Sequence, residues 1–213
     1  MDPDKPFWRS AKTVFLLLLA SARRRGDIHA IDPRRVTFTR AGVILEPYPG
    51  YLPKIRSTAE GEARYQPIVI RPLSPFTDDP GELALCPVKA LRDYHAWAER
   101  RSPGRKRFFL SLRQDGHPVA KATISAWVVK LLKFAYRHAS EEDARLASTS
   151  VHEIRALAAS IALQSNFALA EVLRAATWAT PGVFAAFYLR DVSGLRDGLH
   201  VLSPCVVAGS AVH

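Results

Sequence analysis

A histidine and an arginine three residues apart are the first candidates for chemistry in this chain. His152 and Arg155 lie in the segment Val151–Arg155, which begins a helical pattern, so their side chains are predicted to share one face of the first turn. The N-terminal end of a helix favours an anion, because its peptide N–H groups and the helix dipole are both positive there. The spacing therefore predicts a phosphate-binding site.

Four further residues have types that suit phosphate chemistry. Arg24 lies in the run Arg23–Arg25, and Lys54 lies in a stretch rich in proline, glycine and charge. Trp178 and Tyr188 follow the His152 helix and are ten residues apart. Most of these candidates, and the His152–Arg155 pair, also have an ordinary interpretation: an arginine run is typical of a solvated surface, a bare His-x-x-Arg pair can simply cap a helix, and single aromatic residues are typical of a core.

Several common kinds of active site are excluded by their missing motifs. The chain has no zinc-protease, nucleophile-elbow, dinucleotide-binding or Walker motif, and no paired acidic cluster suited to Mg²⁺. Its two cysteines, Cys86 and Cys205, cannot make a four-ligand zinc site or a disulfide scaffold by themselves. We therefore expect no metal and no cofactor.

The order of these residues resembles a known catalytic signature. Together they are similar to the signature of the tyrosine recombinases, also called the phage-integrase family, and the likeness spans nearly the whole chain; the residues are Arg24, Lys54, His152, Arg155, Trp178 and Tyr188. The segments 85–91, 152–155 and 178–191 look closest to recombinases of eukaryotic DIRS and Crypton mobile elements.

The resemblance implies covalent catalysis on DNA without metal or ATP. It implies that Tyr188 attacks a phosphodiester to form a 3′-phosphotyrosyl bond, while Arg24 and Arg155 stabilise the charge of the transition state. It further implies that Lys54 protonates the leaving oxygen, and that His152 assists proton transfer. Trp178 would then donate its indole N–H to a phosphate oxygen.

Some assignments within the resemblance have close alternatives. Arg23 could replace Arg24, although Asp27, three residues after Arg24, matches an acidic position of the family. Arg56 and Arg64 share the basic stretch with Lys54. The family's glycine-leucine lead-in to the first arginine is replaced here by alanine and arginine, but no charge is lost from the predicted site.

The predicted fold class is mixed α+β, mainly α. Hydrophobic periodicity predicts helices at 7–22, from Cys86–Pro87 onward, and at 123–138, 152–164, 168–176 and 181–190. β-Branched runs predict a small antiparallel sheet near the N-terminal third, with strands at 36–39, 42–45 and 65–70 and a basic hairpin loop at 46–64. Residues 26–33 and 72–81 are predicted to be turns and linkers. The segment 108–111 fits either a short strand or a loop that enters the core.

Length and composition favour one globular domain. The chain has 213 residues, of which 48% are hydrophobic. We expect a tyrosine recombinase catalytic domain at 1–192 and a C-terminal tail at 193–213 that is flexible or exchanged between protomers. An N-terminal core-binding domain is expected to be absent, because few residues precede Arg24.

The charge predicts a polyanionic partner. A formal net charge of +10 favours nucleic acid, so we expect double-stranded DNA and a homo-oligomer assembled on it, with no membrane and no small-molecule substrate. The longest apolar run, Val14–Ala20, is too short to span a membrane, and no signal peptide is recognisable. The expected location is the nucleus in a eukaryote, and otherwise the cytoplasm or nucleoid.

Three functions follow from these expectations. The first is site-specific DNA recombination or integration by the catalytic domain of a mobile-element recombinase. The second is a non-catalytic DNA-binding relic, or domesticated derivative, of such an enzyme. The third is strand passage of the type IB topoisomerase kind, which uses the same chemistry to relax supercoils.

Overall fold

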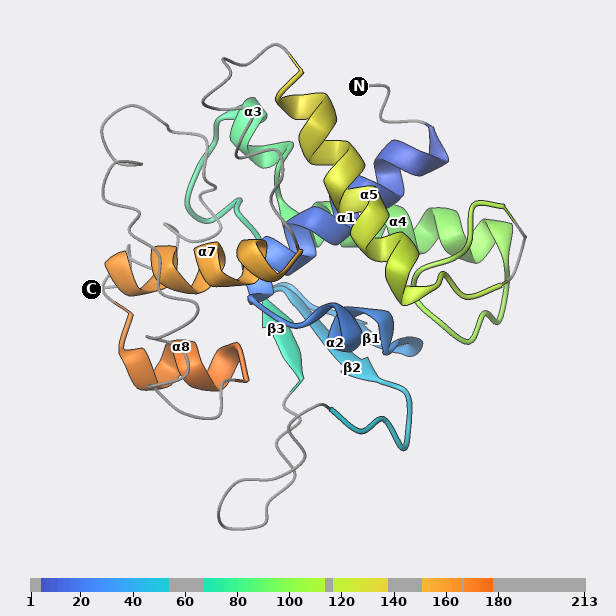
Figure 1. Ribbon diagram of the computed structural model, residues 1–213, viewed down its shortest axis with the longest axis horizontal. Helices are drawn as coiled ribbons and strands as arrows, with labels where there is room; N and C mark the ends of the chain where they lie inside the picture. The colour runs from blue at the N-terminus through green and yellow to red at the C-terminus, as the bar shows by residue number, and fades with distance from the viewer. Residues whose placement is uncertain (1–4, 54–66, 114–116, 138–150, 166, 178–213) are drawn as a thin grey trace.

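Helix α1 (Pro6–Ser21) runs through the centre of the molecule and contacts several other helices. The computed structural model describes residues 5–53, 67–113, 117–137, 151–165 and 167–177. In Figure 1, α1 is packed against α4 (Pro87–Arg101), α5 (Lys121–Ala135) and α7 (Val151–Gln164). Because these helices cover it from several sides, α1 is buried along most of its second half, including Leu16–Leu19.

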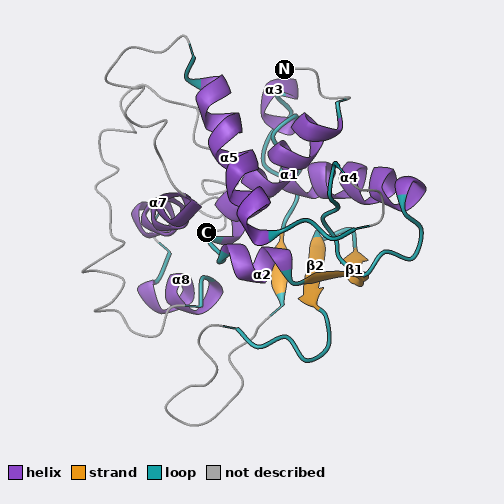
Figure 2. Cartoon of the chain, turned by 45° about the vertical axis from the view of Figure 1, so that its right-hand side comes forward, coloured by secondary structure: helices purple, strands orange, loops and turns teal. Residues whose placement is uncertain are grey.

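A three-stranded antiparallel sheet lies beside the helices, as Figures 1 and 2 show. Its strands, in spatial order, are β1 (Ile31–Phe38), β2 (Val43–Pro47) and β3 (Ile68–Ile70). The turn between β1 and β2 requires glycine at position 42, where φ is +144° and a Cβ would lie 2.0 Å from the carbonyl oxygen of Ile70. The predicted fold class, a mainly helical α+β chain with a small antiparallel sheet, is confirmed.

The segment that follows α1 differs from its prediction. Residues 26–33 were expected to be turns, but they contain helix α2 (Arg25–His29) and the start of β1. The turn residues Gly26 and Asp27 suggested a loop, whereas tertiary burial of Ile28 and Ile31 makes this segment part of the core. The local rule fails here because packing outweighs turn propensity.

The turn that ends α1 has an unusual backbone. Ala22 adopts the left-handed conformation with φ of 49°, and its N–H donates to the Leu18 carbonyl over 3.0 Å. A non-glycine residue in this region carries strain, which the surrounding structure must outweigh. The consequence is a sharp change of direction that separates Arg23 and Arg24 from the axis of α1.

The remaining predicted elements agree with the structure in most places. Helices α1, α4, α5, α7 and α8 (Leu169–Ala175) lie where periodicity predicted them, with ends that differ by up to three residues. The linker predicted at 72–81 ends in the short helix α3 (Pro80–Leu83). Residues 108–111 form a loop that enters the core, and Leu110 forms an isolated antiparallel β-bridge with Pro118. The helix predicted at 181–190 lies outside the described residues.

A buried arginine after α4 contacts a histidine ring and disfavours its protonation. The Arg105 guanidinium donates to Nδ1 of His95 over 2.8 Å and also to Glu99. The His95 ring stacks on Phe108 with 5.7 Å between ring centroids and 4° between planes. Burial, followed by the positive charge of Arg105, lowers the pKa of His95.

We predict that this histidine makes stability depend on pH. Its pKa in the unfolded chain is about 6.5, so the unfolded chain binds the proton first as the pH falls. The contribution of His95 is therefore fully present above that value and is lost as the pH falls through the window below it. The urea midpoint should decrease between pH 7.5 and 5.

His95→Gln keeps an acceptor for Arg105 but does not titrate, so its urea midpoint should fall less over the same pH range. Because burial also lowers the pKa of His29, part of the dependence should remain in this variant. Identical pH profiles for the wild type and His95→Gln would contradict the assignment.

Candidate functional site

Arg24 lies at the start of α2, where a neighbouring carboxylate fixes its backbone. It is the N-cap residue of the helix, and its N–H donates to Oδ2 of Asp27 over 3.2 Å. Its carbonyl accepts from the N–H groups of Asp27 and Ile28 over 2.9 and 3.2 Å. Both the N–H and the carbonyl of Arg24 are thus hydrogen-bonded within α2, and its side chain is half-buried.

Arg155 enters the same region from α7. It lies near the start of that helix and is buried, with 3% of its surface exposed. The helix forms because its buried face consists of small and aliphatic residues, which pack against α1 and α8. A guanidinium buried to this degree requires close polar partners.

The two guanidiniums meet at the C-terminal end of α8. Arg155 donates to the carbonyl of Ala176 over 2.6 Å. Arg24 donates from one nitrogen to both the carbonyl and the hydroxyl of Thr177, each over 3.1 Å. Arginines that are 131 positions apart in the sequence therefore contact adjacent residues, and they concentrate positive charge where the helix dipole is negative.

A strained turn makes this arrangement possible. Thr177 has φ of 57°, a left-handed conformation that β-branched residues rarely adopt. The turn directs the Thr177 carbonyl and hydroxyl to the same Arg24 nitrogen, and these two hydrogen bonds offset part of the strain. The next residue in the chain, Trp178, is one of the predicted site residues.

His152 lies one helical turn before Arg155 and is exposed. Because residues three apart share a helix face, it is oriented toward the same side of α7 as Arg155. No bond joins its side chain to either arginine among the interactions described. The sequence prediction that His152 and Arg155 lie at the N-terminal end of a helix is confirmed, because α7 begins at Val151.

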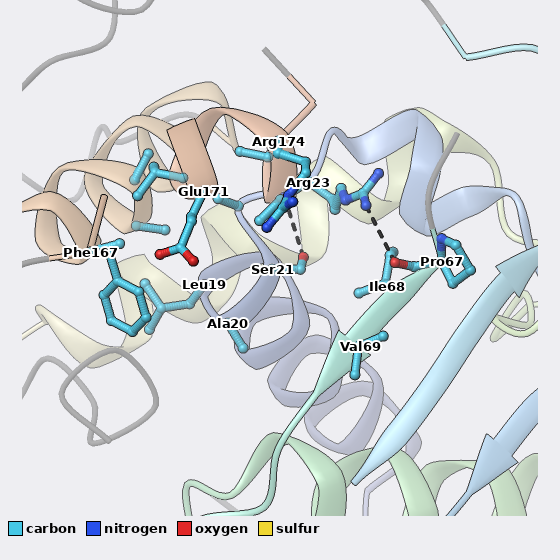
Figure 3. A pocket seen from close by; sticks show the side chains of 17 residues that line it. Leu19, Ala20, Ser21, Arg23, Pro67, Ile68, Val69, Phe167, Glu171 and Arg174 are labelled. Atoms are coloured by element: carbon cyan, nitrogen blue, oxygen red, sulfur yellow. Dashed lines mark hydrogen bonds between the residues drawn. The ribbon is translucent and has the colours of Figure 1, made fainter. Parts of the chain in front are cut away.

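The structure distinguishes Arg24 from its neighbour Arg23. Arg23 is 3% exposed and donates to the carbonyl of Pro67 over 3.5 Å, at the edge of β3. Figure 3 shows its side chain directed toward Pro67, while its backbone N–H donates to the Ser21 hydroxyl. Among the contacts described, it is Arg24 that reaches the end of α8, so Arg24 is the better candidate for the site.

A cavity lies next to Arg23. It has a volume of about 430 Å³ and is bounded by the end of α1, β3, α7 and α8. Most of its lining is aliphatic, and the charged groups around it are those of Arg23, Glu171 and Arg174 (Figure 3). The cavity borders both Arg23 and Ala176, the residue to which Arg155 donates.

Three of the six predicted site residues lie outside the described residues: Lys54, Trp178 and Tyr188. The chain reaches Lys54 from the turn at Tyr48–Tyr51, which is bonded to α2, and it reaches Trp178 directly from Thr177. The described parts thus bring together Arg24 and Arg155, with His152 one turn away on the Arg155 helix.

Sequence reasoning missed two residues of this site. Thr177 supplies two acceptors to Arg24, and Tyr51 donates its hydroxyl hydrogen to Asp27 over 2.8 Å. The tyrosine in a Pro- and Gly-rich turn three residues before Lys54 was a weak signal that could have been noted. Nothing in the sequence indicated that Thr177 adopts a left-handed backbone.

The described part of the chain offers neither a metal site nor a membrane-spanning helix. It contains no group of three or more His, Cys, Asp or Glu side chains able to hold a metal ion. None of its helices combines the length and the apolar character needed to cross a bilayer. Comparisons of the chain with family models, curated proteins and solved structures found no match.

We predict that this region binds a tetrahedral oxyanion through Arg24. Sulfate should raise the free energy of unfolding of the wild type more than chloride does at equal ionic strength, by about 1.4 kcal/mol at a tenfold excess over its Kd. Arg24→Gln should lose more than half of this sulfate-specific gain, since a planar charged donor is replaced by a neutral one. Urea unfolding measures both values.

Arg25→Gln is the matched control for that measurement. Arg25 is also half-buried on α2, but it donates to the Ser125 hydroxyl over 2.6 Å and not to the end of α8. This variant should keep the sulfate effect. An equal loss in both variants would mean that sulfate responds to general positive charge.

Proposed function

We propose that this chain is the catalytic domain of a tyrosine recombinase, which cleaves and rejoins DNA for site-specific recombination or integration. The observation that carries the proposal is the convergence of Arg24 and Arg155 on Ala176 and Thr177. These are two residues of the signature, from distant parts of the chain, and they meet directly before another of its residues, Trp178.

Charge and fold class also support this function. A net charge of +10 suits a protein that binds the DNA backbone. Two guanidiniums offer planar donors that suit a phosphate whose charge grows in the transition state. The mainly helical fold with a small antiparallel sheet agrees with the fold expected for this family.

The proposed reaction exchanges one phosphodiester for another. The Tyr188 hydroxyl oxygen forms a bond to phosphorus, the bond from phosphorus to the 5′ oxygen breaks, and the DNA 3′ end becomes a phosphotyrosine. The phenolic proton passes to solvent, and a proton from Lys54 neutralises the leaving 5′ oxygen. His152 assists the proton transfers, and Trp178 donates to a non-bridging oxygen.

The remaining expectations belong to the same proposal. They are a resemblance closest to DIRS- and Crypton-type elements, a catalytic domain at 1–192 with a tail at 193–213, and assembly as a homo-oligomer on double-stranded DNA. The chemistry uses neither a metal nor a cofactor. A nuclear location follows in a eukaryote, and the cytoplasm or nucleoid otherwise.

A second candidate is a non-catalytic DNA-binding derivative of such an enzyme. It is favoured by the fact that Arg24 and Arg155 both donate to main-chain carbonyls at the end of α8. These bonds stabilise the helix end without any substrate, so selection for the fold alone could retain them.

Covalent trapping separates the two candidates. A library of duplexes with a nick that releases the cleaved strand end should yield a protein–DNA adduct that resists denaturant. Tyr188→Phe should abolish the adduct, because phenylalanine has no oxygen to attack phosphorus. Tyr136→Phe, which alters a tyrosine after α5, should retain it.

The absence of an adduct from every wild-type reaction would contradict the enzymatic proposal. The second candidate would then predict duplex binding without cleavage. Relaxation of a supercoiled plasmid by the wild type, with no strand joined to a second duplex, would instead indicate activity of the topoisomerase kind.

Salt dependence tests the role of Arg24 in binding DNA. Binding of the wild type to duplex DNA should weaken steeply with salt concentration, and Arg24→Gln should reduce the slope of log K against log salt by about 1. Tyr188→Phe should leave the slope and the affinity nearly unchanged, since it removes no charge. Fluorescence anisotropy at several salt concentrations measures both, and an unchanged slope for Arg24→Gln would exclude a phosphate contact.

A further inference from the structure

A buried carboxylate connects Arg24 to the turn that precedes Lys54. Asp27 is 2% exposed. One of its oxygens accepts from the Tyr51 hydroxyl over 2.8 Å, and the other accepts from the Arg24 backbone N–H over 3.2 Å. Because a buried carboxylate must keep its donors, a change at Tyr51 is transmitted to the backbone from which the Arg24 side chain extends.

The position of Tyr51 is itself fixed by its own turn. Its N–H donates to the Tyr48 carbonyl over 3.1 Å, and the Tyr48 N–H donates to the Ala30 carbonyl at the end of α2 over 3.0 Å. The two tyrosine rings lie 5.7 Å apart, and the Arg107 guanidinium lies 3.7 Å from the centre of the Tyr48 ring. The Tyr51 hydroxyl also lies close to Gly26, where an added Cβ would approach it to 3.3 Å.

We propose that Tyr51 is a positioning residue for Arg24: its hydroxyl orients Asp27, and Asp27 fixes the backbone from which Arg24 reaches the end of α8. The inference rests on the proposed function, since it assigns Tyr51 to the same site. It attributes the effect to the hydroxyl, because a phenylalanine ring would occupy the same place but could not donate to Asp27.

The first test is the single-turnover cleavage of a trapping duplex selected with the wild type. Tyr51→Phe should reduce the cleavage rate constant by about 10- to 100-fold, as small displacements of a catalytic group do, while the Kd for DNA changes less than twofold. Tyr48→Phe is the matched control: it retains the ring beneath Arg107, and its rate should stay within twofold of the wild type.

The second test identifies the group through which Tyr51 acts. In a substrate with sulfur at the 5′ bridging position, the leaving thiolate needs no proton, so a defect in proton delivery is suppressed. Lys54→Ala should be rescued by this substrate. Tyr51→Phe should remain slow, because its defect lies in the charge stabilisation by Arg24. Rescue of Tyr51→Phe by sulfur, or cleavage of the oxygen substrate by Tyr51→Phe at the wild-type rate, would overturn the proposal.

A third measurement does not depend on cleavage. Sulfate-specific stabilisation should fall in Tyr51→Phe, as in Arg24→Gln, and should persist in Tyr48→Phe. Asp27→Asn, which alters the acceptor of the Tyr51 hydrogen bond, should also reduce the sulfate-specific stabilisation. If the wild type forms no DNA adduct, the proposed reaction fails, and this measurement alone decides the role of Tyr51; undiminished stabilisation in Tyr51→Phe would then refute that role.

Discussion

The site depends on two guanidiniums that must be brought to the end of one short helix. Arg24 and Arg155 donate to adjacent residues, Thr177 and Ala176, whose carbonyls form the negative end of α8. An arginine keeps its charge when buried, so each must find acceptors inside the protein. These hydrogen bonds connect the start of α2 and helix α7 to the end of α8.

The strained positions of the backbone are found close to this constraint. Among the described non-glycine residues, positive φ values occur at Ala22 and Thr177. Ala22 lies two residues before Arg24, and Thr177 is the residue that Arg24 contacts. Left-handed turns at both ends of the contact redirect the chain where the start of α2 contacts the end of α8. The strain is offset by the core around α1 and by the hydrogen bonds of the arginines.

A carboxylate and a tyrosine extend the constraint to the sheet side of the molecule. Asp27 joins the start of α2 to the turn at Tyr48–Tyr51, which follows β2. The segments that precede Lys54 and Trp178 are thus both bonded to the neighbourhood of Arg24. The position of α2 is therefore linked to several stretches of the chain that are distant in sequence.

The sequence by itself determined the helical pattern of α1, α4, α5, α7 and α8, the antiparallel sheet and the position of His152 and Arg155 near the start of one helix, because periodicity and spacing are local properties. It also nominated Arg24 through a resemblance that spans the chain. It did not predict helix α2, whose turn-forming residues conceal a segment buried by tertiary packing. Nor could it indicate that Thr177 would accept from Arg24, or that Tyr51 would bind Asp27. Those contacts were decided by the tertiary structure, because they join residues up to 153 positions apart. The Arg24 contact also depends on the left-handed backbone of Thr177, which is strained and is stable only within the folded protein.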